Sequence, residues 1–311
     1  MMKETAENIT VVSTRNFVKV SRVAFFLGIL ICILAVFSSF MGLFSTTEGE
    51  SYTFETLRGE TVEIFGKGIY KYDSVFLVSA FQGQDAVILF LGVPLLVVSL
   101  FSYRKESLRW TLFLSGVLAF FLYVYTSTVF GAAYNQLFLV YVSLFSLCFF
   151  VFILIFSSIK LNNLHKDEIN NLPRLGPAIF MFVSGLVTLF VWLEPLIRSM
   201  SENTPPELLG AYSTMVTDAL DLGIITPLTI ISGVLILRRK PMGYKIAFPL
   251  LGIILLLLPT ITLTTLFQLY NGVTFTTAEI IGPISGFSVL GALSLLIMII
   301  LLRKIPSKTD S

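Results

Sequence analysis

The chain has few of the side chains on which most enzymatic chemistry depends. It contains 1 histidine and 2 cysteines in 311 residues, and only 13% of its residues are charged. With so few of these residues, the sequence contains no cluster of histidines and cysteines that could bind a metal ion. It also contains neither a phosphate-binding glycine loop nor a dinucleotide-binding fingerprint. We therefore expect no metal and no cofactor. The formal net charge of +2 gives no support for a nucleic-acid partner.

Long apolar runs dominate the sequence instead. The hydrophobic fraction is 55%, against roughly 45 to 50% in soluble domains. A helix needs about 20 apolar residues to cross a hydrocarbon core of roughly 30 Å. Several segments meet this requirement, so the sequence predicts an all-α membrane protein with about eight transmembrane helices. The predicted spans are 22–44, 86–103, 109–130, 136–159, 176–196, 219–237, 246–270 and 280–302.

Basic residues are distributed unevenly between alternate loops. One set of loops, together with both chain ends, carries 17 of the 21 lysines and arginines, and the other set carries 13 of the 19 acids. Positive residues are held on the cytoplasmic side during insertion. The pattern predicts a multi-pass protein of the cell membrane with the N- and C-termini in the cytoplasm and the lipid bilayer as its partner.

The two halves of the chain share a pattern. Residues 84–105 align without a gap with residues 217–238, which pairs Asp85 with Asp218 and Pro94 with Pro227. This favours a tandem 4+4 repeat with both copies in one orientation, although apolar spans also align by chance. The predicted segments are a cytoplasmic tail (1–21), a first four-helix unit (22–160), a cytoplasmic linker (161–175), a second four-helix unit (176–302) and a cytoplasmic tail (303–311).

The longest outer segment, residues 45–85, has a pattern of its own. Alternating residues within 51–65, around the pair Arg58–Gly59, predict a small extracytoplasmic β-hairpin closed by a turn. The stretch "YKYDSVFLVSAFQGQD" (70–85) is expected to form a separate amphipathic helix at the membrane interface. This segment offers the largest surface outside the bilayer to a protein partner.

Candidate binding residues gather near the outer ends of the spans. Ionisable groups within a membrane are costly, so each is a functional candidate. Asp218 and Asp221 lie three residues apart on one helix face, and with Glu279 they would form an acidic pocket open to the outside. No catalytic or metal-binding residue is assigned. The candidate ligand-binding set is Asp218, Asp221, Glu279, Asp85, Tyr134, Asn135 and Gln268.

A purely structural role competes with binding at each acid. A helix N-terminus favours negative charge, and the spans that carry these acids begin on the outer side. Thr276 and Glu279 have the spacing of a capping box, and we favour capping for Glu279 and Asp85. Asp221 lies past the cap position, so capping and binding are equally supported there.

Prolines and small residues within the spans have similar alternatives. Pro94, Pro227, Pro259 and Pro283 free backbone carbonyls, as in the broken helices of transporters, but a tolerated kink is the simpler account. The GxxxG spacing of Gly282 and Gly286 favours a close helix contact.

Two stretches resemble a known family. Residues 130–147 ("FGAAYNQLFLVYVSLFSL") and 219–244 ("ALDLGIITPLTIISGVLILRRKPMGY") are similar to a family of multi-pass membrane proteins of bacteria and archaea that has no assigned activity. The resemblance covers most of the chain from the first span to the eighth. It implies a prokaryotic cell membrane and emphasises Tyr134, Asn135 and the Asp218/Asp221 pair, but it implies no activity.

Three functions are compatible with the sequence. The repeat, the prolines and the outer acids favour a transporter-like protein or one that binds a small solute. The alternative is a structural or assembly protein that contacts membrane-protein partners through its extracytoplasmic segments. An intramembrane enzyme that modifies lipids is less supported, because only the acids Asp218, Asp221 and Glu279 could supply an acid/base pair.

Overall fold

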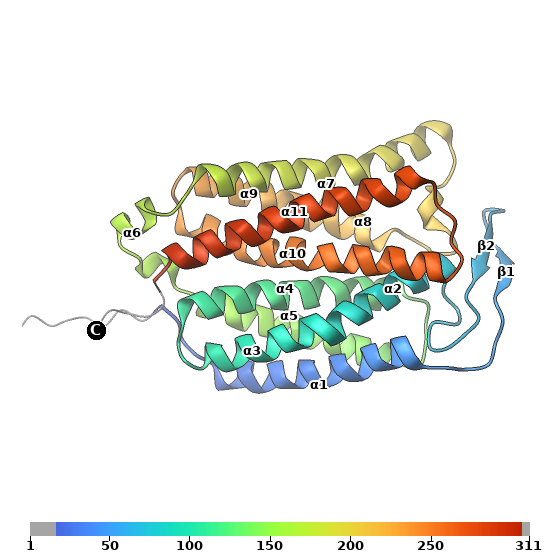
Figure 1. Cartoon of the computed structure of the whole chain (residues 1–311), viewed down its shortest axis with the longest axis horizontal. Helices are drawn as coiled ribbons and strands as arrows, with labels where there is room; N and C mark the ends of the chain where they lie inside the picture. Colours follow the sequence, from blue (N-terminus) through green and yellow to red (C-terminus); the bar gives the residue numbers. More distant parts are fainter. Residues whose placement is uncertain (1–16, 307–311) are drawn as a thin grey trace, which may run out of the picture.

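The computed structural model describes residues 17–306, apart from the side chains of residues 207, 277–280 and 283. Within this range, eight helical runs are long and apolar enough to cross a membrane. They lie side by side in a bundle, with a two-stranded sheet beyond one end (Figure 1). We call this the hairpin end, and the other the opposite end. The chain is therefore a multi-pass membrane protein, as its composition predicted.

The observed spans agree with the predicted ones to within a few residues in most cases. The 23 residues of the first span rise about 35 Å, at roughly 1.5 Å per residue, which exceeds the hydrocarbon thickness. The spans are α1 (Arg22–Phe44), α2 to α3 (Val75–Tyr103), α4 (Leu108–Gly131), α5 (Phe138–Ser158), α7 (Leu175–Glu202), α8 to α9 (Val216–Leu237), α10 (Pro241–Tyr270) and α11 (Thr277–Lys304). Shorter helices are η2 (Leu161–Asn163), α6 (Lys166–Asn170) and η3 (Glu207–Leu209).

The second span begins earlier than the sequence predicted. We expected a span at 86–103 after a separate interfacial helix within 70–85, but one helical run covers Val75–Tyr103. Its N-cap is Ser74, whose hydroxyl accepts a hydrogen bond from a backbone amide of the first turn. Asp85 therefore lies inside the helix, and the capping role that we favoured for it is wrong.

Partners inside the bundle explain how the polar residues of α2 fit within a span. The side-chain amide of Asn271 donates to Gln82 Oε1 at 3.0 Å and to Ser79 Oγ at 2.9 Å. Gly83 lies against α10, where an added Cβ would meet the Thr264 backbone nitrogen at 2.5 Å. Such pairing offsets the cost of polar groups in apolar surroundings. A hydropathy profile treats these polar residues as the end of an apolar span, because it contains no information about hydrogen-bond partners from other helices.

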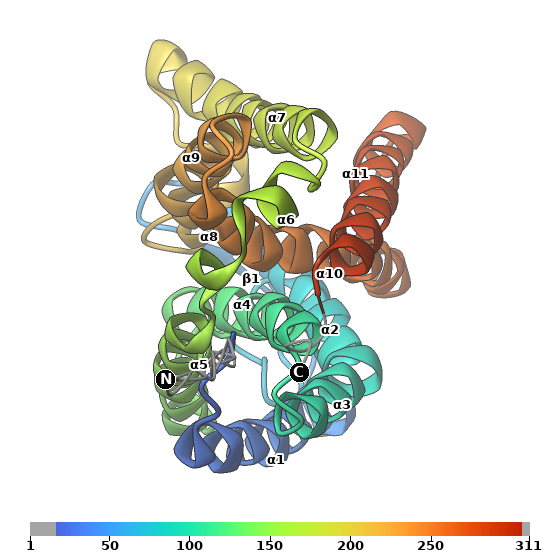
Figure 2. The ribbon, with the colours of Figure 1, turned by 90° about the vertical axis from the view of Figure 1, so that its left-hand side faces the viewer.

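The helices of each half of the chain form a group of their own (Figure 2). In the first group, α1 packs against α2, α3 and α5, while α4 packs against α3 and α5. In the second group, α9 packs against α7 and α10, while α11 packs against α10 and, less extensively, against α7. The groups meet where α10 packs against α2 and α4. The apolar stretches of α4 and α10 are accordingly 72% and 56% buried, against 22% for α11.

Two glycines form a close contact in this interface. A Cβ added to Gly252 would overlap the backbone of Gly116, and one added to Gly116 would meet the Phe248 carbonyl oxygen at 2.9 Å. Membrane helices approach this closely where small residues face each other. We had expected such a contact at Gly282 and Gly286, but an added Cβ at either position meets nothing within 4 Å. Within the described chain that expectation is wrong.

The predicted β-hairpin is confirmed. β1 (Tyr52–Glu55) pairs antiparallel with β2 (Thr61–Ile64). Gly59 in the turn takes a φ of +84°, which glycine adopts without the steric strain of a Cβ. Arg58 Nη2 donates to the backbone carbonyls of Gly210 and Tyr212. The hairpin therefore holds the loop that precedes α8.

The basic loops lie together at the opposite end. Figure 1 shows the α3–α4 and α9–α10 connections and α6 at this end, away from the sheet. Some of its cations bind backbone carbonyls, as is common at helix C-termini. Arg109 Nε donates to the carbonyl of Ile305 at 2.6 Å, and Lys245 Nζ donates to that of Ile159 at 2.8 Å. The alternation of basic and acidic loops in the sequence thus corresponds to two ends of one bundle.

Candidate functional site

Two of the predicted acids lie together inside the bundle near the hairpin end. Asp218 and Asp221 are 5% and 8% exposed. Asp218 belongs to the first turn of α8 (Val216–Leu220), and Asp221 begins the π-helical turn η4 (Asp221–Ile225). The two carboxylates are close enough to interact electrostatically. The structure thus places both residues of the predicted pair in one buried region.

The surroundings of the two carboxylates differ. Trp192 of α7 donates its Nε1–H to Asp221 Oδ2 at 2.7 Å, and the Tyr123 hydroxyl of α4 is a second neighbour of the same carboxylate. Asp218 Oδ2 is buried and has no hydrogen-bond partner among the described residues. A buried acceptor left unpaired costs about 1–3 kcal/mol, and more when it is charged. Asp218 is therefore the residue of the pair with capacity for a ligand.

The helix that carries the pair has an unusual turn. The π-helical turn η4 ends two residues before Pro227, which lies at the start of α9 (Thr226–Leu237). The proline ring clashes with the carbonyl four residues earlier in a regular α-helix, and the wider π-turn relieves that clash. Such turns are frequent at functional sites. The same arrangement occurs where η1 (Ile88–Gly92) precedes Pro94, between α2 (Val75–Val87) and α3 (Val93–Tyr103).

Asp85 lies in a different and fully packed position. Its Oδ2 accepts a hydrogen bond from the Tyr70 hydroxyl at 2.7 Å. Gly42 of α1 leaves room for the carboxylate, because an added Cβ would overlap Asp85 Oδ2. Burial, followed by the charge of Asp85, raises the pKa of the Tyr70 phenol well above its ordinary value. Tyr70 therefore stays a hydrogen-bond donor to Asp85.

The other predicted residues are spread along the hairpin end. Tyr134 is 77% exposed, whereas Asn135 and Gln268 are buried. Asn135 Oδ1 accepts from the Leu137 amide at 2.9 Å and so stabilises the turn before α5. The side chain of Glu279 lies outside the described residues, so its convergence with the aspartate pair stays a prediction.

A further buried carboxylate, which no sequence pattern indicates, joins the loops at the hairpin end. Asp73 is 1% exposed, and its Oδ1 accepts from the Ala133 amide at 2.7 Å and from the Tyr212 hydroxyl at 2.9 Å. The Ser74 amide in turn donates to the Tyr212 hydroxyl at 3.1 Å. Burial raises the pKa of Asp73 to about 7, although both of its hydrogen bonds act to lower it. No local pattern indicates this cluster, because its members come from three distant segments.

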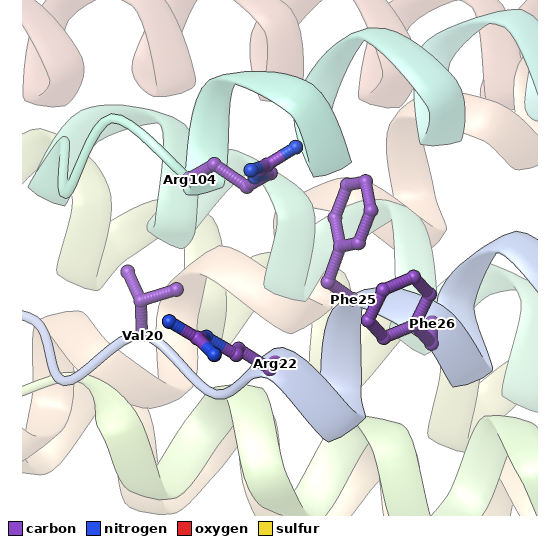
Figure 3. Close-up of a pocket in the computed structure, with 5 residues that line it drawn as sticks. All are labelled: Val20, Arg22, Phe25, Phe26 and Arg104. Atoms are coloured by element: carbon purple, nitrogen blue, oxygen red, sulfur yellow. The ribbon is translucent and has the colours of Figure 1, made fainter.

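A cavity of about 340 Å³ lies at the opposite end of the bundle (Figure 3). In the sequence, its two arginines indicate only the orientation of the spans. Its lining residues are Val20, Arg22, Phe25, Phe26 and Arg104.

Comparison with known proteins finds no match among family models, curated proteins or solved structures. In the described part of the chain, no group of three or more His, Cys, Asp or Glu side chains is arranged to hold a metal ion. The fold places the chain in the class of helical multi-pass membrane proteins. The geometry around Asp218 is the feature that bears on its function.

Proposed function

We propose that this chain is a transporter-like or solute-binding protein of the cell membrane, which takes up a small cationic solute at Asp218 and Asp221. The observation that carries the proposal is the buried, unpaired Oδ2 of Asp218 next to a second buried carboxylate. Ionisable groups within a membrane protein are expensive and mark solute or ion pathways.

The charge balance of the pair favours a cation. Trp192 supplies a neutral donor to Asp221, the Tyr123 hydroxyl is a second neutral neighbour, and neither aspartate forms an ion pair with a described lysine or arginine. Two buried carboxylates without positive charge repel each other and lose their hydration. A small cation with hydrogen-bond donors would supply both the charge and the missing partner for Asp218.

The pair opens to the outer side of the membrane in this proposal. The opposite end carries the basic loops, and the positive-inside rule supports a cytoplasmic location for that end and for both termini, with the hairpin extracytoplasmic. The resemblance of residues 130–147 and 219–244 to proteins of bacteria and archaea supports a prokaryotic cell membrane. The solute would therefore enter from outside the cell.

A tandem duplication would make Asp85 and Asp218 equivalent positions, of which only the first has a described side-chain partner. Each π-turn begins three residues after an aspartate, Asp85 or Asp218, and ends two residues before a proline. Each set of four spans also has the same order of packing neighbours. In the first unit Tyr70 binds the aspartate, whereas Asp218 in the second unit has no such partner. The two copies would then have diverged, with the second one binding solute.

A thermal-shift screen of the purified chain tests the proposal. The probes are sodium, potassium, tetramethylammonium and putrescine at constant ionic strength. We expect at least one cation to raise the melting temperature of the wild type, and Asp218→Asn and Asp221→Asn to weaken that response about tenfold or more, because each removes one carboxylate charge. Glu194→Gln, at an exposed position of α7, serves as the matched control. A wild type that responds to no cation, or variants that respond equally, would contradict the proposal.

An assembly role is the alternative, and one observation favours it. Tyr52, Phe54 and Leu57 of the hairpin are large apolar side chains that are exposed beyond the bundle, where apolar groups in water mark interaction surfaces. Crosslinking from these positions in native membranes distinguishes the two functions, since a chain that always migrates alone has no assembly partner.

A further inference from the structure

The cavity at the opposite end lies between the start of α1 and the end of α3. Arg22 is the first residue of α1, and Arg104 follows the last residue of α3. Figure 3 shows the two arginines on opposite sides of the space, with Phe25 and Phe26 beside it. The cavity thus combines two positive charges with an aromatic wall.

The walls of this cavity are held by the fold. The Ser21 amide donates to the Tyr103 hydroxyl at 2.8 Å, and that hydroxyl donates to the Lys19 carbonyl at 3.3 Å. Tyr103 is fully buried. Phe25 packs edge-on against Phe101 of α3, with ring centroids 5.5 Å apart. The cavity is therefore present before any ligand binds, which lowers the entropy that binding must overcome.

Its two arginines have no anionic partner among the described residues. Arg104 lies over the Phe25 ring, with Cζ 5.0 Å from the centroid, which orients the guanidinium by a cation–π contact. Other cations at the same end, Arg109 and Lys245, already bind backbone carbonyls. The guanidiniums of Arg22 and Arg104 keep their donors for a ligand. Two like charges that line one cavity repel each other, so an anion between them is favourable.

The position of the cavity points to a lipid. Both arginines stand at the ends of spans, the level at which lipid headgroups lie. Phe26, one turn deeper than Arg22, is 68% exposed, and Phe101, about one turn deeper than Arg104, is 52% exposed. An anion bound by the guanidiniums would therefore continue directly into apolar surface that faces the bilayer. A soluble anion would use the arginines and leave that surface unused.

We propose that this cavity binds the phosphate of an anionic phospholipid, with the arginines at the headgroup and one acyl chain along Phe26. Guanidinium groups match phosphate oxygens with paired hydrogen bonds. Basic pockets between membrane helices bind anionic headgroups in this way. A zwitterionic lipid binds more weakly, because it brings a cation towards Arg22 and Arg104.

Thermal shift of the full chain in mixed micelles tests the site. Phosphatidylglycerol is titrated against phosphatidylcholine, and sn-glycerol 3-phosphate serves as the soluble phosphate. We expect phosphatidylglycerol to raise the melting temperature well beyond phosphatidylcholine. Arg22→Gln and Arg104→Gln should each require roughly tenfold more phosphatidylglycerol for half of that rise, since each removes charged hydrogen bonds.

The matched control is Arg238→Gln with Arg303→Gln, which removes two exposed charges at the same end but none from the cavity. This pair should retain the wild-type response. Equal shifts by both lipids, or an unchanged response in both cavity variants, would overturn the proposal. A shift of the same size with sn-glycerol 3-phosphate alone would assign the site to a soluble phosphate instead. Melting temperatures in phosphatidylcholine show that each variant is folded.

Discussion

Gly252→Val is expected to lower the melting temperature of the purified chain by several degrees or to abolish folded yield. The added side chain would enter the space occupied by the Gly116 backbone, in the interface between α4 and α10. Overpacking of an interior costs about 1–3 kcal/mol where neighbours can shift. Backbone atoms shift less readily than side chains, so we expect the upper part of this range or more.

Gly286→Val is the matched control for that change. It makes the same substitution within a membrane span, but an added Cβ at Gly286 meets nothing within 4 Å. We expect its melting temperature and elution profile to stay close to those of the wild type. Equal losses in both variants would show that valine in place of glycine destabilises a span by itself, and the α4–α10 contact would then have no special weight.

Asp73→Asn is expected to make the stability of the chain less dependent on pH. Burial raises the pKa of Asp73 from 3.8 to about 7, so the folded chain retains a proton that an unfolded chain has lost. Stability from this group is therefore highest in acid and falls as the pH rises from about 4 to 7. The slope is about 1.4 kcal/mol per pH unit between the two pKa values and levels off near pH 7, which gives about 2 kcal/mol between pH 5 and pH 7.

Asparagine keeps an oxygen for the Ala133 and Tyr212 donors but carries no charge at any pH. The melting temperature of the wild type relative to Asp73→Asn should thus fall by several degrees between pH 5 and pH 8. Glu63→Gln, at an exposed position of β2, controls for loss of an acid in the same region. A wild type and an Asp73→Asn variant that melt in parallel across this range would show that Asp73 ionises as it does in an unfolded chain.

Predictions that rested on single segments succeeded best. The first span was predicted at residues 22–44 and observed at Arg22–Phe44, and the hairpin formed around Gly59 as its turn chemistry indicates. The start of the second span was predicted wrongly because Gln82 and Asp85 interrupt the run of apolar residues. Their partners, Asn271 and Tyr70, are contributed by other segments.

For the candidate acids, too, the sequence indicates the positions but not the partners. Asp85 and Asp218 align in the sequence, yet Asp85 receives a hydrogen bond from Tyr70 while Asp218 Oδ2 receives none from a described residue. Trp192 gave no signal as a neighbour of Asp221, since the two are 29 residues apart in the chain. The cavity between Arg22 and Arg104 was equally invisible, because each arginine appeared only as one more basic residue beside a span.

The sequence by itself determined that this is a multi-pass helical protein, where most of its spans lie and which loops are basic. These properties depend on composition over about 20 residues and on local turn chemistry, so they need no knowledge of neighbours. Only the tertiary structure decided which buried carboxylates are satisfied, which glycines bring α4 and α10 together and where two arginines line a cavity. Inside a bilayer a polar group depends on partners from other helices for stability, and those partners are brought together only by packing.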